Sequence, residues 1–306
     1  MQAAIEVAHA GGGGVVRLSR GTYLTEAPIR LRSGVALRGD GSGTVLKAGP
    51  DFLSRTGPHG GHPLLTTEGA DDVTIAALTA DHSGDALDAD VPGRLVEYLV
   101  DGRHSENLLL EEVTTCNPFT YSIAIVGSSR FSVRGCRTSV STSGRYTQLD
   151  GIHVLGSRYG EVIGNDVDQG GGDDGDDGLV AHTITQPCHD VVFRDNRVRG
   201  GRHGSAMQLA VGGATLHDVV VRNNFFYDSP RGLRSGQWSA GGMLRRVIVG
   251  GDAAGGNAFW NNGGAAVDFA EVPTEDVVVS HNTSVASGEF LGRTGTLLRA
   301  NSVAGV

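Results

Sequence analysis

The chain has 306 residues and a formal net charge of −9, and 48 of its residues are glycine. This acidic balance argues against nucleic acid as a partner, because a surface that binds phosphates should be basic. No apolar run is long enough to span a membrane, and no charged and apolar leader precedes the first residues, so the sequence predicts no membrane segment and no signal peptide. The cellular location stays unknown; a secreted or cell-surface protein is favoured if the N-terminus has been trimmed.

The cysteines give no sign of a disulfide framework or a zinc site. There are three, at Cys116, Cys136 and Cys188, which is an odd number without metal-ligand spacing. We therefore expect buried free thiols.

The chain opens on a predicted helix that is followed by glycines and short strands. Residues 2–10 are largely apolar, and the glycines at 11–14 end the helix. Residues 15–18, 21–24 and 29–39 then have strand-like patterns. A stack of strands needs a cover over its first coil, so we expect the helix to provide it.

This opening resembles the start of pectate-lyase-like proteins. After the helix and the glycine run come the patterns V-x-L-x-x-G-T-Y, from Val16, and L-x-S-G-V-x-L-x-G-x-G, from Leu31. The resemblance implies an all-β fold, the right-handed parallel β-helix. No linker or change of composition divides the coils, so we expect one domain, with residues 1–14 as the helical cap and glycine run and residues 15–306 as the coils.

A repeat later in the chain also indicates stacked coils. Strands that begin with Asp-Val-Val recur after 28 and 58 residues, and an asparagine follows each start six residues later: Asp190 with Asn196, Asp218 with Asn224, and Asp276 with Asn282. A period of 20 to 50 residues is typical of a solenoid. Because asparagine tolerates turn conformations and can hydrogen-bond along a stack, we predict an asparagine ladder at one corner. The recurring pairs His189-Asp190 and His217-Asp218 are interpreted as turn pairs.

A second repeat runs from residue 148 to residue 238. Its four segments alternate small, apolar, variable and apolar residues after members that are 27, 28 and 26 residues apart, namely Asp150, Asp177, Ser205 and Arg231. The alternation predicts a buried column on one face, made of Ile152, Leu179, Met207 and Leu233. It places on the other face His153, Val180, Gln208 and Arg234. The small residues before them should form the floor of a shallow groove on that other face, namely Gly151, Gly178, Ala206 and Gly232.

The same segments resemble the polygalacturonase-like family of glycoside hydrolases. That family carries the motifs Asn-Thr-Asp, Gly-Asp-Asp, Gly-His-Gly and Arg-Ile-Lys on consecutive coils. Here they appear, in that order, as Gln148-Leu149-Asp150, Gly175-Asp176-Asp177, Arg202-His203-Gly204 and Arg234-Ser235-Gly236. The resemblance implies that Asp176 is the general acid and that Asp150 and Asp177 hold the attacking water. It further implies that His203 tunes the acid or binds substrate, and that Arg234 pairs with a carboxylate or hydroxyl of the sugar.

Simple chemistry agrees with these roles. Inverting hydrolysis needs a protonated carboxyl for the leaving oxygen and a carboxylate that activates water. Neighbouring coils lie about 4.8 Å apart, so carboxyls on two coils can share one site. Crowded like charges raise one pKa, which provides the acid.

Two departures from the family pattern bear on the substrate. The lysine after the arginine is replaced by Gly236, and the first asparagine by Gln148. The pair that grips a uronate is half missing, so a neutral or differently charged sugar is favoured over pectin. We expect a polysaccharide or oligosaccharide substrate and no cofactor. The further substrate-binding candidates are His153, Gln208, Arg202, Arg231 and Trp238.

Two other functions stay open. An acidic run with glycines includes Asp173 and Asp174, which are calcium candidates because carboxylates on a flexible loop suit that ion. A calcium-dependent polysaccharide lyase or a uronate epimerase would use such a site, with an arginine as the base. The third hypothesis is a non-catalytic glycan-binding module like a tailspike. The last coil, residues 297–306, has no evident polar cap, which favours a homo-oligomer through that end.

Overall fold

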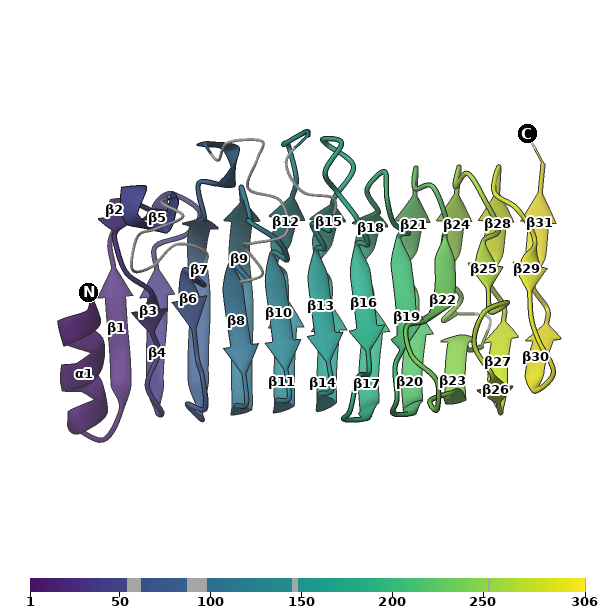
Figure 1. Ribbon diagram of the computed structural model, residues 1–306, viewed down its shortest axis with the longest axis horizontal. Helices are drawn as coiled ribbons and strands as arrows, with labels where there is room; N and C mark the ends of the chain where they lie inside the picture. Colours follow the sequence, from purple (N-terminus) through teal and green to yellow (C-terminus); the bar gives the residue numbers. More distant parts are fainter. Residues whose placement is uncertain (54–61, 87–97, 145–147, 253, 306) are drawn as a thin grey trace.

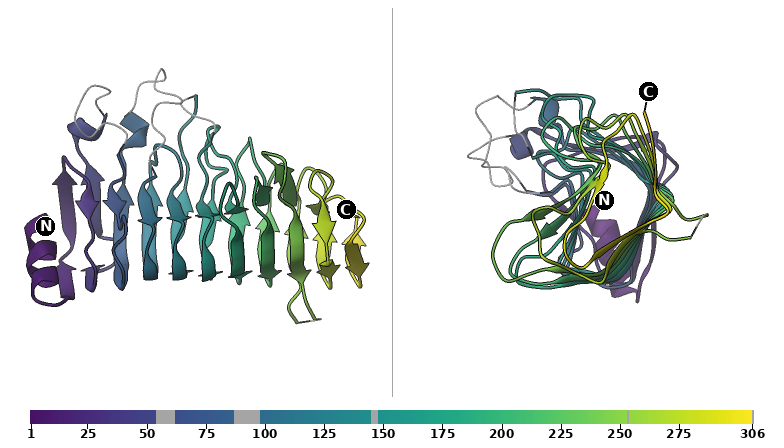
Figure 2. Two further views of the ribbon diagram at one scale, coloured as in Figure 1. Left: turned by 60° about the horizontal axis from the view of Figure 1, so that its bottom comes forward. Right: turned by 90° about the vertical axis from the view of Figure 1, so that its right-hand side faces the viewer.

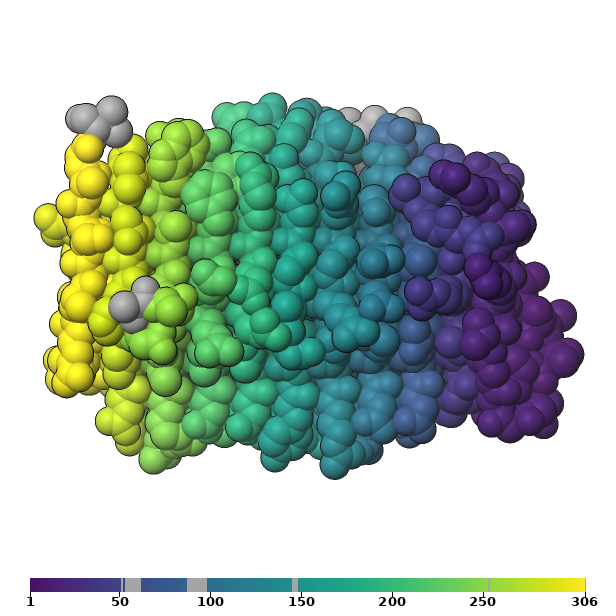
Figure 3. Space-filling model, turned by 180° about the vertical axis from the view of Figure 1, so that it is seen from behind, coloured from purple at the N-terminus to yellow at the C-terminus, as the bar shows by residue number. Residues whose placement is uncertain are grey.

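The computed structural model describes residues 1–53, 62–86, 98–144, 148–252 and 254–305. Short strands wind into coils that stack along one axis, from helix α1 (Gln2–Ala10) at one end to the C-terminal strands at the other (Figure 1). Seen along the axis, the coils superpose on one outline (Figure 2, right). From behind, they form parallel bands in sequence order (Figure 3). Two further short helices are α2 (Pro50–Leu53) and the 3-10 helix η1 (Gly84–Ala86).

One face of the stack is a ten-stranded parallel sheet, which carries the segments of the candidate site. Its strands are β3 (Ile29–Arg30), β6 (Leu65–Thr66), β8 (Val100–Arg103), β10 (Ile123–Val126), β13 (Ile152–Leu155), β16 (Leu179–His182), β19 (Met207–Val211), β22 (Leu233–Gln237), β25 (Val267–Asp268) and β29 (Phe290–Leu291).

The other two faces are joined into one sheet by two long strands, β7 (Val73–Asp81) and β9 (Glu106–Cys116), which pair with strands of both faces. The first of these faces holds β1 (Gly14–Leu18), β4 (Val35–Gly39), β11 (Ser129–Arg134), β14 (Arg158–Ile163), β17 (Cys188–Arg194), β20 (Leu216–Arg222), β23 (Leu244–Gly250), β26 (Thr274–Glu275), β27 (Val277–Ser280) and β30 (Thr296–Arg299). The second holds β2 (Gly21–Thr25), β5 (Thr44–Ala48), β12 (Arg137–Ser139), β15 (Asp166–Asp168), β18 (Arg197–Arg199), β21 (Phe225–Tyr227), β24 (Ala258–Trp260), β28 (Thr283–Val285) and β31 (Ser302–Ala304).

The strand register matches the alternation in the sequence. Ile152 lies opposite Leu179, which lies opposite Met207 and then Leu233, and all four side chains are buried. The predicted internal column is therefore confirmed. The next residue of each strand faces the other way, in the register His153, Val180, Gln208 and Arg234.

The predicted asparagine ladder is confirmed and is longer than expected. Each side-chain amide donates to the side-chain oxygen one coil further on, at 2.9–3.0 Å, along Asn165, Asn196, Asn224, Asn257, Asn282 and Asn301. The same amides also donate to backbone carbonyls of the preceding coil, such as that of Val162. The amides of this corner are thereby hydrogen-bonded to one another and to backbone, as buried polar groups require.

The helical cap is also confirmed. Helix α1 spans the predicted residues and buries Ile5 against the first coil. The Gln2 amide donates to the Arg30 carbonyl at 3.0 Å, which ties the helix to β3. At the other end, the last coil leaves apolar side chains exposed, among them Leu297, Leu298 and Val303.

Candidate active site

The motif residues lie where the chain enters neighbouring strands of the ten-stranded sheet. Asp150 precedes β13, Asp177 precedes β16, and Arg234 lies within β22. Glycines make this close stacking possible. A Cβ on Gly175 would lie 1.8 Å from the Gln169 carbonyl oxygen, and one on Gly204 would lie 2.4 Å from the backbone of Asp176. Both motif glycines are therefore required by the close approach of other backbone, from the same coil at Gly175 and from the preceding coil at Gly204.

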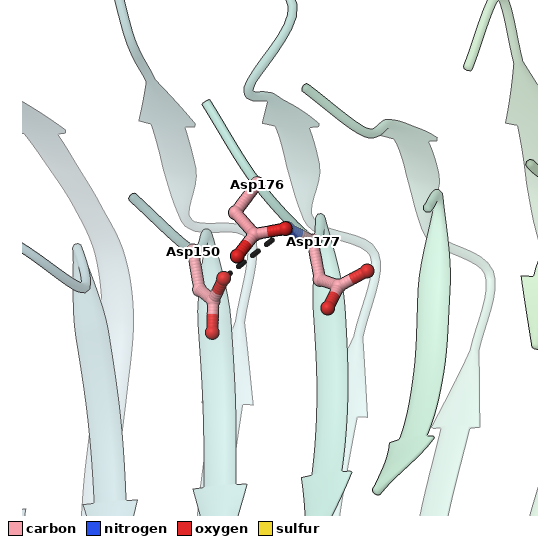
Figure 4. A group of neighbouring side chains, drawn as sticks. All are labelled: Asp150, Asp176 and Asp177. Atoms are coloured by element: carbon pink, nitrogen blue, oxygen red, sulfur yellow. Dashed lines mark hydrogen bonds between the residues drawn. The ribbon is translucent and has the colours of Figure 1, made fainter. Parts of the chain in front are cut away.

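Aspartate at these positions also holds one coil to the next. The backbone N–H of Asp177 donates to Asp150 Oδ1 at 3.1 Å, and the backbone N–H of Ser205 donates to Asp177 Oδ1 at 2.7 Å. Figure 4 shows the carboxyl groups of Asp150, Asp176 and Asp177 side by side at the start of two neighbouring strands. The repeat thus places two carboxylates one coil apart, and Asp176 beside them.

The three carboxyls form one acid cluster. One oxygen of each lies within 4.8 Å of an oxygen of each of the others. Burial, with the charges of Asp150 and Asp177, raises the pKa of Asp176 to about 8. Burial and the charge of Asp177 raise the pKa of Asp150 well above its usual value, and burial raises the pKa of Asp177 against the opposing charge of Arg234. The cluster therefore holds at least one proton at neutral pH.

Arg234 compensates part of the remaining charge, and Gln208 links it to Asp177. Arg234 Nη2 lies 3.8 Å from Asp177 Oδ2. With the Gln208 amide in the orientation that satisfies both neighbours, its nitrogen donates to Asp177 Oδ2 at 3.1 Å, and its oxygen accepts from Arg234 Nη2 at 2.8 Å. We assign the charge balance of the cluster to this guanidinium and to the shared protons.

Most of the predicted site residues line one pocket of about 290 Å³. Its lining consists of Tyr121, Gln148, Asp150, His153, Asp176, Asp177, His182, His203, Gln208, Arg234 and Trp238. The four catalytic candidates therefore come together, as do the substrate-binding candidates His153, Gln208, Arg234 and Trp238. The side chain of Trp238 is 62% exposed, so its ring is open to solvent.

Two predicted arginines do not line this pocket. Arg202 is exposed and pairs with Asp173 at 3.1 Å. Arg231 is exposed as well, although its charge lowers the pKa of Asp176 and of Asp177. Arg231 thus acts on the cluster at longer range than Arg234 does.

The calcium candidates lie outside the acid cluster. Asp173 is exposed and engaged by Arg202, whereas Asp174 is buried. Within the described residues, three metal-ligating side chains come together only at Asp150, Asp176 and Asp177. A calcium ion prefers six or more oxygen ligands, so a site at Asp173 and Asp174 would need oxygens beyond these two carboxylates, and calcium binding there stays a prediction.

The structure adds two residues that the sequence did not assign to the site, Tyr121 and His182. The Tyr121 ring stacks on His153, with centroids 4.4 Å apart. His182 Nδ1 lies 3.0 Å from His153 Nε2. His182 is two residues beyond Val180, the register partner of His153, so strand alternation places it on the same face. That signal was present in the sequence.

The predicted glycine floor is wrong. A Cβ on Gly151 would lie 2.5 Å from Val167 Cγ1, and one on Gly178 would lie 2.4 Å from Val198 Cγ1. Both valines belong to the hydrophobic core, so these glycines face inward. They allow the turn into each strand to pack on the core, and the groove is lined by the polar side chains that follow. Alternation does not extend to these positions because they precede the strands.

Other polar groups have structural roles. His189 and His217 each contact the next aspartate at 2.7 Å. Both pairs lie within strands, β17 and β20, so the predicted turns are wrong; only the positive φ of Asp190 and Asp218 is turn-like. All three cysteines are free; Cys136 and Cys188 are buried and Cys116 is half-buried. Among the described residues, no helix has the length and apolarity to cross a membrane.

Comparison with known proteins identifies the fold. A family model described as "Right handed beta helix region" matches residues 97–244. No curated protein matches the chain. An exopolygalacturonase from Thermotoga maritima is 18% identical, with a TM-score of 0.69 over 99% of this chain and 87% of that one.

Two other solved structures have the same fold. The tailspike protein of E. coli bacteriophage HK620, in complex with pentasaccharide, is 18% identical, with a TM-score of 0.71 over 100% of this chain and 59% of that one. The mannuronan C-5 epimerase A-module from Azotobacter vinelandii is 18% identical, with a TM-score of 0.63 over 100% and 90% of the two chains. The chain is therefore a right-handed parallel β-helix, as its opening residues and its repeats predicted.

Proposed function

We propose that this protein is a glycoside hydrolase that cleaves a polysaccharide or oligosaccharide with its clustered aspartates. The observation that carries the proposal is the acid cluster, in which three carboxyls share a pocket and the pKa of Asp176 is raised to about 8. Asp176 is then protonated at neutral pH and is the least buried of the three. It is suited to donate its proton to the leaving glycosidic oxygen.

Asp150 and Asp177 are suited to hold the attacking water. Two oxygens within 4.8 Å can share one water, because two hydrogen bonds of about 2.8 Å span up to about 5.6 Å. Their side chains are only 6% and 5% exposed. Hydrogen bonds with backbone, His153 and Gln208 fix the orientation of both carboxylates and leave lone pairs that can accept from a water between them. Direct attack by water inverts the configuration at the sugar carbon.

Because of the spacing of the carboxyls, the anomeric configuration of the product has to be measured. Inverting enzymes usually have carboxyl groups about 6.5–9.5 Å apart, and retaining ones about 5–5.5 Å apart. The oxygens here lie within 4.8 Å, which is compact for an inverting site. NMR of the first-formed anomer would show inversion if water attacks directly; retention would assign the nucleophile to Asp150 or Asp177.

The proposed substrate is a sugar chain whose binding needs no more than one cationic side chain of the pocket, that of Arg234. Arg234 is engaged by Asp177 and Gln208, and the position of the family's lysine is Gly236. The exposed ring of Trp238 offers an apolar surface against which a sugar can stack. The solved relatives include an exopolygalacturonase and a tailspike in complex with pentasaccharide, and both support a glycan as the partner.

A lyase or an epimerase is the second candidate, favoured by the structural similarity to the mannuronan C-5 epimerase module. In either case an arginine would remove the proton beside a uronate carboxylate, and the nearest is Arg234. Its pairing with Asp177 makes it a weak base. A dependence on calcium remains part of this second proposal.

A product assay on a panel of plant and microbial polysaccharides tests these functions. We expect new reducing ends without the ultraviolet absorbance of unsaturated uronate, and no effect of a chelator. Absorbance that disappears with a chelator would replace hydrolysis by the lyase. Saturable glycan binding without product from any bound glycan would favour the non-catalytic, tailspike-like module.

A further inference from the structure

Asp150 is the first member of a buried chain of hydrogen bonds that the proposed hydrolysis does not use. Its Oδ2 lies 2.7 Å from His153 Nδ1, and His153 Nε2 lies 3.0 Å from His182 Nδ1. The last atom, His182 Nε2, is buried and has no hydrogen-bond partner among the described residues. The chain thus runs from a carboxylate through two imidazoles to one unpaired ring nitrogen that borders the pocket.

Both imidazoles are neutral in this position. Burial lowers the pKa of His153 to about 3, and burial together with His153 lowers the pKa of His182 to about 3. The contact between His153 and Asp150 is therefore a hydrogen bond of a neutral ring and not an ion pair. A neutral imidazole carries one proton, which can be on either nitrogen.

Counting protons leaves two complete arrangements. In the first, Asp150 is ionised, His153 Nδ1–H donates to Oδ2, and His182 Nδ1–H donates to His153 Nε2. In the second, Asp150 is protonated and donates to His153 Nδ1, His153 Nε2–H donates to His182 Nδ1, and His182 Nε2 carries the last proton. The second arrangement contains one more proton than the first, and no imidazolium is needed in either.

We propose that His153 and His182 are positioning residues that form a proton relay with Asp150 and change tautomer together when Asp150 gains or loses its proton. To discharge Asp150, Oδ2–H breaks as His153 Nδ1–H forms, His153 Nε2–H breaks as His182 Nδ1–H forms, and His182 Nε2–H passes its proton to a water that enters the pocket beside it. Loading runs these three transfers in reverse from hydronium. The relay gives a buried carboxyl an exchange route.

This inference deepens the proposed function and rests on it for its purpose. An Asp150 that already carries a proton cannot take one from the attacking water, so only the first arrangement is the competent base. The other titratable and charged groups that face the site are Asp176, Asp177, Arg234, Tyr121 and His203. The two aspartates favour the protonated arrangement of Asp150, and Arg234 favours the ionised one.

Nitrogen NMR of the full chain, labelled with 15N-histidine, tests the relay without any substrate. Each ring nitrogen reports whether it carries a proton, so a pH titration follows both tautomers directly. We expect His153 and His182 to move their proton from Nδ1 to Nε2 at one shared pH as the solution is acidified, and to stay neutral throughout. Separate midpoints, or an imidazolium at either ring during this step, would overturn the proposal.

The variant Asp150→Asn sharpens the test. Because the backbone N–H of Asp177 requires an acceptor at residue 150, the asparagine oxygen must face it and its NH₂ must face His153 Nδ1. This variant should fix both rings with the proton on Nε2 at every pH. A variant that still switches would contradict the relay. The signals of His217, which pairs with Asp218, report in the same sample that the fold is kept.

Kinetics then separate a relay from a merely structural contact. His182→Phe retains ring bulk but carries no proton. If product is found, this variant should lose kcat, with KM retained, and shift the acid limb of the pH profile. An unchanged acid limb would assign His182 to packing alone. Because the NMR titration needs no turnover, failure of the hydrolase proposal and failure of the relay give different results.

Discussion

The chain contains two kinds of histidine–aspartate contact, and their distances are the same. His153 lies 2.7 Å from Asp150 in the pocket, and His217 lies 2.7 Å from Asp218 within β20. Hydrogen bonds from Arg246 and from His217 hold the pKa of Asp218 well below its usual range. Burial and Asp177 instead raise the pKa of Asp150. Contact distance alone therefore does not decide where a proton resides. Burial and the neighbouring charge decide it, and that charge is Asp177 beside Asp150 and Arg246 beside Asp218.

Replacing a carboxyl by an amide should give the largest difference in activity between the two regions. Asp176→Asn removes the proposed proton donor, so we expect a loss of about 100- to 10,000-fold in kcat. The matched variant Asp218→Asn should retain activity because Asp218 lies in β20, outside the pocket lining. The measurement is the initial rate on whichever glycan yields product, with thermal unfolding as the control for folding. Full activity in Asp176→Asn would remove this residue from the mechanism.

Replacing Arg234 or Arg246 should give the next largest difference between the two regions, this time in stability. Arg234→Gln removes a partner of the buried Asp177, and we expect a loss of about 1–3 kcal/mol in the free energy of unfolding. Arg246→Gln acts on an exposed pair that water and salt screen, so we expect a much smaller loss than in Arg234→Gln. Urea unfolding at neutral pH measures both. Equal losses would mean that burial does not distinguish the two sites.

The pH dependence of stability should have opposite signs in the two regions. The raised pKa of Asp176 means that the folded state binds the proton more tightly, so its stability contribution is full below about pH 4 and is lost as the pH rises through about 8. The lowered pKa of Asp218 means that its contribution is present above about pH 4 and is lost on acidification.

Unfolding curves across this range should therefore change in slope when either aspartate is replaced. Asp176→Asn should flatten the decline between about pH 4 and pH 8, and Asp218→Asn should flatten the decline below about pH 4. A decline between pH 4 and pH 8 that persists unchanged in Asp176→Asn would contradict the assigned proton.

The smallest effect is expected at the pocket rim. Trp238→Ala removes an exposed ring, and stacking of about 0.5–1.5 kcal/mol corresponds to a rise of about 2- to 10-fold in KM. Trp260, which is 43% exposed and lies on the second face, is the matched control, and Trp260→Ala should leave KM unchanged. Equal effects of the two variants would indicate that Trp238 does not contact the sugar.

The local periodic pattern allowed much of the fold to be predicted from the sequence. Alternation over four segments predicted the column from Ile152 to Leu233, and the spacing of Asn196 and Asn224 predicted the ladder. Both depend on backbone geometry that repeats from coil to coil. The motif spacing likewise indicated the approach of Asp150 to Asp177.

Side chains beside the strands were less predictable because their direction depends on irregular backbone. The inward direction of Gly151 and Gly178 follows from turns that alternation does not describe. Arg202 lies in such a turn too, where Asp173 of the preceding coil engages it. Tyr121 precedes its strand in the same way, so its stacking on His153 had no periodic signal.

The asparagine ladder has a consequence for how such a protein can diversify. Successive rungs are 31, 28, 33, 25 and 19 residues apart in sequence, yet each makes the same amide contact with the next. One corner therefore keeps the coils aligned whatever their length. Insertions elsewhere in a coil can lengthen or shorten the loops without disturbing the alignment of the strands. Groove shape, and with it the choice of ligand, can then drift while the scaffold stays constant.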